Sequence, residues 1–419
     1  MNTKTILASC YAVNPYKGSE NGMGWNFVYQ IARYNKVIAI TRKNNKEMID
    51  HYMNHNQDEV FKNITFLYFD LPYWLRFWKK GGRGAMLYYY LWQKRIVPFI
   101  KKQNLHFDIT HNVNFHNDWT PSSLWKLNKP MVWGPIGHHP EIPEHYLNPY
   151  PLKYLLQDRV TWFIKNCFWE LSFSLQKTKN KSDHILGMNS GVAKALKIST
   201  EPFSILPSVA TEDNFSGEIS IKNGFSIISV GRFVPLKGFD LTLLSFANFI
   251  ESIAIEDRMN CKLTLVGTGP EKELYKTIIA QNHLEMYVEI IEWIDRTELM
   301  KLYKKSSVFL FPSHEGAGMV VAEALSFGLP VVCLNNQGPG EFINSECGFA
   351  VTQLEYNKTI LELKEALSAL YFDKKLLQQM SINARKHYLD KFTWDSRGDY
   401  LKTIYNTLGD ENYSRTPAQ

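Results

Sequence analysis

Short apolar runs alternate with longer amphipathic segments along most of the chain. In the first half, runs of strand length cover residues 5–11, 37–40, 64–69, 109–112 and 131–133, and helix-sized segments separate them. Strands alternating with helices are typical of a parallel sheet covered on both faces. The pattern therefore predicts a doubly wound α/β domain.

A second series of the same kind begins after residue 220. Its runs cover residues 225–230, 262–266, 288–292, 308–311 and 331–334, and the polar stretch 210–224 before it has little periodicity. We expect an N-terminal Rossmann-like domain at 1–207, a linker at 208–222, a C-terminal Rossmann-like domain at 223–391, and a C-terminal helix and tail at 392–419. Ligands of such sheets bind at the carboxyl ends of the strands, so two domains facing each other would enclose a central cleft.

Composition narrows the class of protein. The chain has 419 residues, 45% of them hydrophobic and 21% charged, which suits two globular domains and argues against a disordered or fibrous protein. Its five cysteines include no CxxC pair, so neither a disulfide framework nor a zinc site is expected, and a cytoplasmic location is the simplest. The first residues predict a strand rather than a signal peptide, and the uncharged stretch from Gly84 to Gln93 is about half as long as a membrane span.

The segment from residue 309 to residue 333 carries the clearest chemistry. It reads as a strand, a glycine-bearing turn, a helix and another strand. Glycines allow a ligand to approach the backbone, and the first N–H groups of a helix attract anions. We expect a diphosphate to bind along the backbone of Gly316, Ala317, Gly318, Met319 and Val320.

Two carboxylates accompany this turn. Glu315 precedes the predicted helix and Glu323 lies within it. Carboxylates accept strong hydrogen bonds from hydroxyl groups, so their place beside a phosphate site favours a sugar nucleotide as the ligand. The alternative for each alone is an acid that favours a helix N-terminus or a solvated helix residue.

Two cations lie in an earlier loop, after the predicted strand 225–230. Arg232 and Lys237 are placed to stabilise the charge that develops on a departing nucleoside diphosphate. The alternative for each alone is a surface residue. Since the chain contains no Asp-x-Asp triplet, we expect neither a metal nor another cofactor.

Weaker candidates lie at other strand ends. Gly267, in a Gly-Thr-Gly turn, and Trp293 lie in loops that a family resemblance, described below, places near the nucleotide base, although a common turn and a core or rim tryptophan are the alternatives. In the N-terminal half, a glycine-rich loop contains Gly18, Gly22 and Gly24, and it suits either a phosphate or a tight turn.

Histidines follow two strands of the N-terminal half. His111 and His116 are both candidates for the acceptor side of the cleft, with a structural histidine as the alternative, and the choice between them stays open. His138 and His139 form a pair without carboxylate partners in the sequence, so we do not expect them to bind a metal.

Taken together, these motifs resemble those of retaining family-4 glycosyltransferases, which are glycosyl transferases of group 1 with the GT-B fold. Glu315 and Glu323 match the family's Glu-x7-Glu motif, and Arg232 and Lys237 match its Gly-Arg…Lys-Gly…Asp pattern. The resemblance implies that Glu315 lies beside the sugar, that Glu323 binds the ribose, and that both cations contact the pyrophosphate. Ala317 replaces a more usual Phe, Ser or Cys.

Further matches extend the resemblance over nearly the whole chain. The Gly-Ser-Glu…Gly-Trp loop at 18–25, the Asp-x-x-His signature ending at His111 and the Phe-Thr-Trp-Asp segment at 392–395 all have counterparts in the family. The last of these implies a C-terminal helix that crosses back to the N-terminal domain. His138 departs from the family's Gly-Pro-x-Gly-Gly turn, in which a second glycine is usual.

The resemblance implies the retaining transfer of a sugar from a nucleoside diphosphate to an acceptor hydroxyl, without a metal. The expected setting is bacterial surface polysaccharide or glycolipid synthesis, with a glycan or lipid-linked acceptor. Aromatic and basic residues from Tyr73 to Arg95 suggest peripheral contact with the inner face of the cell membrane, with core packing as the alternative. No nucleic-acid partner is expected. Two other functions remain open, a nucleotide-sugar epimerase and a noncatalytic sugar-nucleotide-binding protein.

Overall fold

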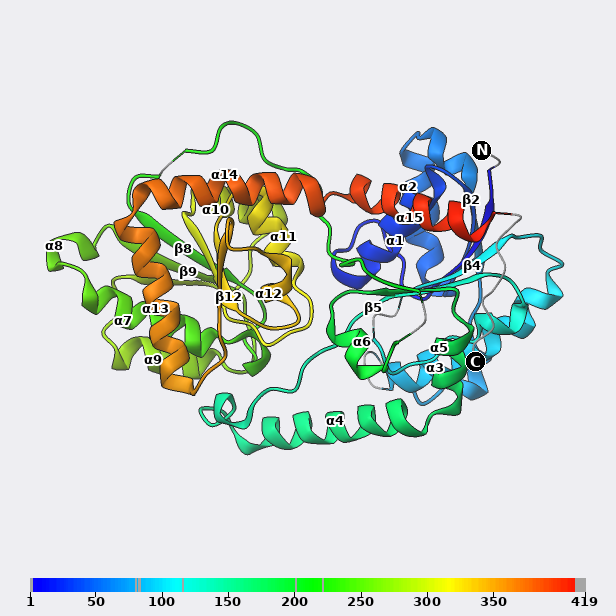
Figure 1. Ribbon diagram of the computed structural model, residues 1–419, viewed down its shortest axis with the longest axis horizontal. Coiled ribbons are helices and arrows are strands. Elements are labelled where there is room, and N and C mark those ends of the chain that lie inside the picture. The colour runs from blue at the N-terminus through cyan, green and yellow to red at the C-terminus, as the bar shows by residue number, and fades with distance from the viewer. Residues whose placement is uncertain are drawn as a thin grey trace. The chain divides into compact units, whose positions relative to one another are not determined.

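The chain forms two compact units, each assembled from separate stretches of sequence. The computed structural model describes residues 3–79, 81, 84–114, 117–199, 202–220 and 222–410. Unit 1 comprises Met1–His138, Phe163–Ser208 and Trp394–Gln419, and unit 2 comprises His139–Trp162 and Val209–Thr393. Figure 1 traces both units along the chain.

Unit 1 is built on a seven-stranded parallel sheet with the order β3-β2-β1-β4-β5-β6-β7. Its strands are β1 (Thr5–Cys10), β2 (Lys36–Thr41), β3 (Ile64–Tyr68), β4 (Ile109–Asn114), β5 (Met131–Ile136), β6 (His184–Gly187) and β7 (Phe203–Ile205). The order reverses between β1 and β4, as in a doubly wound sheet.

Helices accompany this sheet. They are α1 (Ser19–Ala32), α2 (Lys46–His55), α3 (Ala85–Lys102), α5 (Phe173–Lys181), α6 (Gly191–Ala195) and α15 (Trp394–Leu408). Alternate residues of β1, Ile6 and Ala8, share one buried apolar cluster with Phe27 of α1 and Leu401 of α15. The last helix of the chain therefore completes the core of the unit in which the chain begins.

Unit 2 is built on a six-stranded parallel sheet with the order β10-β9-β8-β11-β12-β13. Its strands are β8 (Phe225–Val230), β9 (Cys261–Val266), β10 (Val288–Ile291), β11 (Val308–Phe311), β12 (Val331–Leu334) and β13 (Gly348–Val351). These two parallel sheets confirm the predicted doubly wound α/β architecture.

Helices cover both faces of the second sheet (Figure 1). The helices of unit 2 are α7 (Phe239–Ser252), α8 (Ile255–Arg258), α9 (Lys272–Gln281), α10 (Arg296–Lys305), α11 (Met319–Ser326), α12 (Pro339–Phe342), α13 (Tyr356–Phe372) and α14 (Lys374–Lys391). Val308 and Leu310 of β11 pack with α7, α9 and α13, whereas Phe309 and Phe311 pack with α10, α11 and α14. The side chains of a strand point alternately to the two faces, so β11 is apolar throughout.

Residues 139–162 pack with unit 2, although the sequence-based boundaries assign them to the N-terminal domain. Tyr146 and Tyr150 belong to the main buried cluster of unit 2. The hydroxyl of Tyr150 donates to Asp240 at 2.6 Å, and that of Tyr146 donates to the carbonyl of Leu354 at 2.8 Å. Buried tyrosines need such partners, and these partners lie far away in the sequence.

Helix α4 (Leu152–Leu171) begins within this segment of unit 2 and continues into the part of unit 1 that starts at Phe163. Of the helices that the structure describes, none combines the length and the apolar character needed to span a bilayer.

Candidate functional site

The loops after β8 and β11 leave the same edge of the unit 2 sheet. The two strands are parallel neighbours, and the strand order reverses between them. A crevice at such a reversal is where α/β sheets bind ligands. The first loop contains Lys237, at the end of the short 3-10 helix Pro235–Lys237, and the second contains Glu315.

Lys237 and Glu315 form an ion pair across these loops. The Nζ atom of Lys237 lies 2.5 Å from Oε2 of Glu315, with side-chain exposures of 18% and 11%. The same ammonium lies 5.1 Å from the ring centroid of Phe311, which adds a cation–π contact. Two residues predicted to act on different parts of the donor therefore contact each other directly.

The second oxygen of Glu315 is buried without a hydrogen-bond partner among the described residues. Burial raises the pKa of Glu315, and the charge of Lys237 opposes that rise. A buried acceptor without a partner is costly unless a ligand supplies the missing donor. Oε1 is therefore the atom of this site that is best prepared to accept a hydrogen bond from a sugar hydroxyl.

The sequence predicts an anion site on the backbone beside Glu315. The N–H of Gly316 donates to Nδ1 of His139 at 3.1 Å, within unit 2. Helix α11 begins at Met319, and Gly318 at its N-cap has no side chain that would cap the first amides. Ala317, Met319 and Val320 are half-buried against the apolar cluster beneath the turn. The contact with His139 was not predicted, because it joins positions 177 residues apart.

A turn after β12 supports the same site, and the sequence did not single it out. The amide of Asn336 donates to the carbonyl of Ser313 at 2.7 Å, and its Oδ1 accepts from the N–H of Gly338 at 3.0 Å. A Cβ atom at Gly338 would lie 2.0 Å from the carbonyl oxygen of Glu315, so only glycine allows this approach. The run Asn-Gln-Gly-Pro-Gly after a strand was the available signal.

Glu323 lies on α11 and is 4% exposed. Its Oε1 accepts from Nη1 of Arg296 at 2.9 Å, and its Oε2 lies 3.5 Å from the hydroxyl of Tyr303. Burial raises the pKa of Glu323, and the guanidinium of Arg296 opposes the rise. Sequence reasoning named Trp293 in the stretch that leads into α10 but assigned no role to Arg296, the first residue of that helix.

Arg232 is exposed in the loop after β8. Burial raises the pKa of Tyr154, whose hydroxyl donates to the carboxylate of Glu271, and the positive charge of Arg232 opposes that rise. Lys237, by contrast, is held on Glu315. The two predicted phosphate ligands thus share a loop and differ in their partners.

The remaining donor-side candidates have distinct surroundings. Gly267 has φ +151°, and a Cβ there would lie 1.8 Å from the carbonyl oxygen of Gly231, so this glycine is required for close packing against the Arg232 loop. Trp293 is 82% exposed between β10 and α10. Trp293 is therefore a surface side chain of unit 2, open to a planar ligand.

His111 is part of the core of unit 1. It is fully buried on β4, with Nε2 at 2.6 Å from the carbonyl oxygen of Gly134 and Nδ1 at 2.6 Å from the hydroxyl of Tyr405. The carbonyl requires a proton on Nε2, so Nδ1 accepts from the tyrosine. Burial lowers the pKa of His111 to about 4, which keeps the ring neutral. With both nitrogens occupied, this ring has no group left for a sugar, and its role is structural.

The other candidates of unit 1 divide in two. His116 lies outside the described residues. The glycine-rich loop leads into α1, where a Cβ at Gly22 or Gly24 would lie 2.2 or 1.9 Å from the carbonyl oxygens of Lys17 and Ala12. These two glycines are required for helix packing, whereas a Cβ at Gly18 would meet open space.

His138 has a carboxylate partner that the sequence did not reveal. Its Nδ1 lies 2.8 Å from Oδ2 of Asp118, and both side chains are buried in unit 1. Its ring also packs on Trp169, with the centroids 5.5 Å apart. These contacts explain how a histidine is accommodated in a turn where the related motif has glycine.

The fold and this site define a GT-B protein with its donor-type loops in unit 2. The part of the chain that carries these loops, residues 211–387, matches the family described as "Glycosyl transferases group 1". Over residues 211–387 the chain is thus similar to glycosyl transferases group 1, in agreement with the resemblance that the motifs around Glu315 and Glu323 carry.

Individual proteins agree with this assignment. An uncharacterized glycosyltransferase of Haemophilus influenzae is 28% identical over 240 residues, which are 53% of this chain and 64% of that protein. The capsular polysaccharide biosynthesis glycosyltransferase CapM of Staphylococcus aureus is 28% identical over 194 residues, 45% of this chain and 47% of CapM. The matches therefore span about half to two thirds of these relatives.

The fold is also that of solved structures. The crystal structure of Anabaena HepE in complex with UDP superposes with a TM-score of 0.61 at 13% identity, covering 96% of this chain and all of the other. At this identity the likeness concerns the fold alone.

Proposed function

We propose that this chain is a retaining, metal-independent glycosyltransferase that moves a sugar from a nucleoside diphosphate to an acceptor hydroxyl. The observation that carries the proposal is the buried Glu315 carboxylate at the reversal of the unit 2 sheet. One of its oxygens is held on Lys237, and the other is without a hydrogen-bond partner among the described residues. Lys237 orients this carboxylate through Oε2, which leaves Oε1 to accept a hydrogen bond from a hydroxyl group.

The diphosphate leaving group is bound from two sides in this proposal. Lys237 and the amides around Gly316 and Gly318 contact the phosphates, and Arg232 reaches them from the exposed part of the same loop. Charge develops on the phosphate as the glycosidic bond breaks, and fixed cations and amides stabilise that charge without reorganising. A phosphate contacting Gly316 would take the place of Nδ1 of His139 on that amide.

The two glutamates contact different parts of the sugar nucleotide in this proposal. Glu315 positions the transferred sugar, and Glu323 binds the ribose hydroxyls from two turns further along. Trp293 supplies an exposed aromatic face beside the base, and Gly267 keeps the neighbouring turn close to the Arg232 loop. Unit 1 supplies the acceptor side.

The acceptor is a glycan or a lipid-linked glycan of a surface polysaccharide pathway. The name of CapM supports a polysaccharide setting by analogy. Tyr73, Trp74 and Phe77 of unit 1 are 75%, 66% and 61% exposed, and basic residues flank them, as expected for a surface that meets anionic lipid at the inner face of the membrane.

A panel of nucleoside diphosphate sugars, tested for thermal stabilisation of the purified protein and then for transfer, examines the proposal. A bound donor raises the melting temperature by mass action. Glu323→Ala and Arg232→Ala should each reduce transfer at least about tenfold while the fold is kept, because each removes a charged donor contact. Normal turnover in both variants would overturn the assignment, and conversion of the donor alone to an epimer would replace it.

A further inference from the structure

Arg296 connects the candidate ribose ligand to another part of unit 2. Its Nη1 donates to Oε1 of Glu323 at 2.9 Å, and its Nη2 donates to Oγ1 of Thr211 at 3.3 Å. The arginine side chain is 52% exposed, whereas that of Glu323 is 6% exposed. The guanidinium therefore holds a buried carboxylate from the solvent side and is itself oriented by a second partner.

Thr211 is a firmly fixed partner. Its N–H donates to the carbonyl of Phe392 at 3.0 Å, and its carbonyl accepts from the hydroxyl of Tyr388 at 2.9 Å. It also forms a parallel bridge with Thr393, the last residue of unit 2 before the chain returns to unit 1. A threonine whose backbone N–H and carbonyl are both hydrogen-bonded gives the arginine a defined position.

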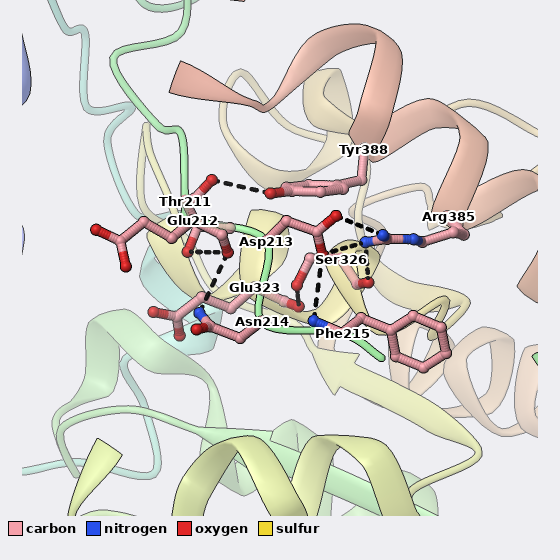
Figure 2. Close-up of polar contacts among 9 residues, drawn as sticks. All are labelled: Thr211, Glu212, Asp213, Asn214, Phe215, Glu323, Ser326, Arg385 and Tyr388. Carbon is pink, nitrogen blue, oxygen red and sulfur yellow. Dashed lines mark hydrogen bonds and ion pairs between the residues drawn. The ribbon is translucent and has the colours of Figure 1, made fainter. Parts of the chain in front are cut away.

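The contacts continue back to α11, as Figure 2 shows. Two residues after Thr211, the carboxylate of Asp213 binds Arg385 through both oxygens, at 2.8 and 2.5 Å. Arg385 also donates to the carbonyl of Ser326 at 2.6 Å, and the hydroxyl of Ser326 donates to the carbonyl of Glu323 at 2.7 Å. Glu323 is thus connected to the segment 211–213 by two indirect routes. Its side chain is linked to Thr211 through Arg296, and its backbone is linked to Asp213 through Ser326 and Arg385.

The contacts of the Glu323 carboxylate determine whether its charged form is favoured. Arg296 and Tyr303, both on α10, are the charged and titratable side chains that contact the Glu323 carboxylate within the described part of the chain. Burial disfavours an ionised carboxylate, and Tyr303 is a distant donor at 3.5 Å. Arg296 is consequently the group that favours the charged form of Glu323.

We infer that Arg296, seated on Thr211, is a positioning residue that keeps Glu323 ionised and aimed for the ribose hydroxyls of the donor. This inference rests on the proposed function, since it takes Glu323 as the ribose ligand. It assigns to the segment 211–213 an indirect part in donor binding, which the segment plays through Arg296 rather than by contact with the donor.

Nucleotide binding measured against pH tests the inference. UDP, GDP, ADP and CDP are titrated calorimetrically into the intact protein, and the tightest is compared with its 2′-deoxy counterpart. In Arg296→Gln, we expect binding of the ribonucleotide to weaken about tenfold at pH 7, as for the loss of a charge-assisted bond. The loss should grow toward pH 6 and shrink toward pH 8.5, because an unpaired Glu323 takes up a proton more readily. The preference for ribose over deoxyribose should fall with it.

Two variants serve as rescue and control. Arg296→Lys keeps the cation and should recover most of the affinity and a wild-type pH profile. Lys301→Gln removes a cation from the same helix, where it pairs with the exposed Glu298 at a similar side-chain exposure of 59%, and should leave binding unchanged. Thr211→Val should give a smaller loss than Arg296→Gln, with Glu323 still paired.

The outcomes separate the inference from the proposal beneath it. If no nucleoside diphosphate binds the wild-type protein, the proposed function fails, and the inference fails with it. If wild-type protein binds and Glu323→Gln loses the ribose preference while Arg296→Gln keeps both the affinity and the pH profile, the inference alone is overturned. Equal losses in Arg296→Gln and Arg296→Lys would also overturn it, since a merely structural role for the arginine predicts no rescue.

Discussion

Nζ of Lys237 lies 2.5 Å from Oε2 of Glu315, and this contact joins the loop after β8 to the loop after β11. The pair places a cation expected on phosphate next to a carboxylate expected on sugar. In a donor complex the two groups would meet where the sugar joins the diphosphate.

Removing the lysine should destabilise the protein in a pH-dependent way. In Lys237→Met the Glu315 carboxylate stays buried without a counter-ion, which costs on the order of 3 kcal/mol in a buried pair. The pKa of Glu315 is already raised by burial and would rise further, so the deficit in unfolding free energy should grow as pH increases from 6 to 8. Urea unfolding at both pH values measures it. Adding Glu315→Gln should restore part of the stability, and a pH-independent deficit would contradict the role of the pair.

His111 should contribute to acid sensitivity. Burial lowers its pKa from 6.5 to about 4, so its contribution to stability is complete above pH 6.5 and is lost as pH falls through 6.5 toward 4. The total is roughly 3 kcal/mol at 1.36 kcal/mol per pKa unit. Unfolding free energies at pH 4.5, 5.5 and 7 should show a shallower loss for His111→Gln than for wild-type protein. The exposed His106→Gln is the control, and an unchanged slope in His111→Gln would exclude this role.

The exposed aromatic residues of unit 1 should govern binding to lipid. Trp74→Ser with Phe77→Ser should weaken binding to vesicles rich in anionic lipid by about tenfold or more, because two large apolar side chains no longer enter the interface. Sedimentation with vesicles at low and high salt measures the effect. Trp293→Ser removes an even more exposed tryptophan from unit 2, and this variant should bind vesicles like wild-type protein. Equal loss in both variants would argue against a specific surface.

Transfer should survive removal of divalent metal ions. Lys237, Arg232 and the amides of the 316–318 turn are expected to supply the stabilisation that an ion would give, so excess EDTA should change the rate by less than about twofold. Transfer assays with and without EDTA, followed by added Mg²⁺, decide the point. A loss that Mg²⁺ restores would refute metal independence.

The sequence predicted the fold well because its signals are local. The run that became β11 is apolar at every position and the run that became β8 is apolar at four of its six, as expected for strands buried on both faces, and the turn at Gly316 follows soon after β11 in the chain. Loops after neighbouring parallel strands meet at one edge, so Lys237 and Glu315 could be assigned to one region without knowledge of their contact.

The sequence did not predict contacts between segments that are distant along the chain. His139 contacts Gly316 across 177 positions, and Arg296 contacts Glu323 from a different helix, 27 positions earlier in the chain. His111 illustrates the opposite error, since a histidine at a strand end resembles a catalytic group until its two buried partners are known. Burial and long-range pairing decide such cases, and neither is encoded in a short window of residues.

Residues 139–162 have a consequence for how proteins of this kind exchange parts. The side chains of Ile142, Tyr146 and Tyr150 lie in the core of unit 2, although the bulk of that unit begins at Val209. A recombination event that replaced only residues 209–393 would therefore pack the core of one protein against residues 139–162 of another. Chimeras that fold should therefore take residues 139–162 and residues 209–393 from the same parent protein. The gene segments that must be exchanged together to replace unit 2 are thus not contiguous.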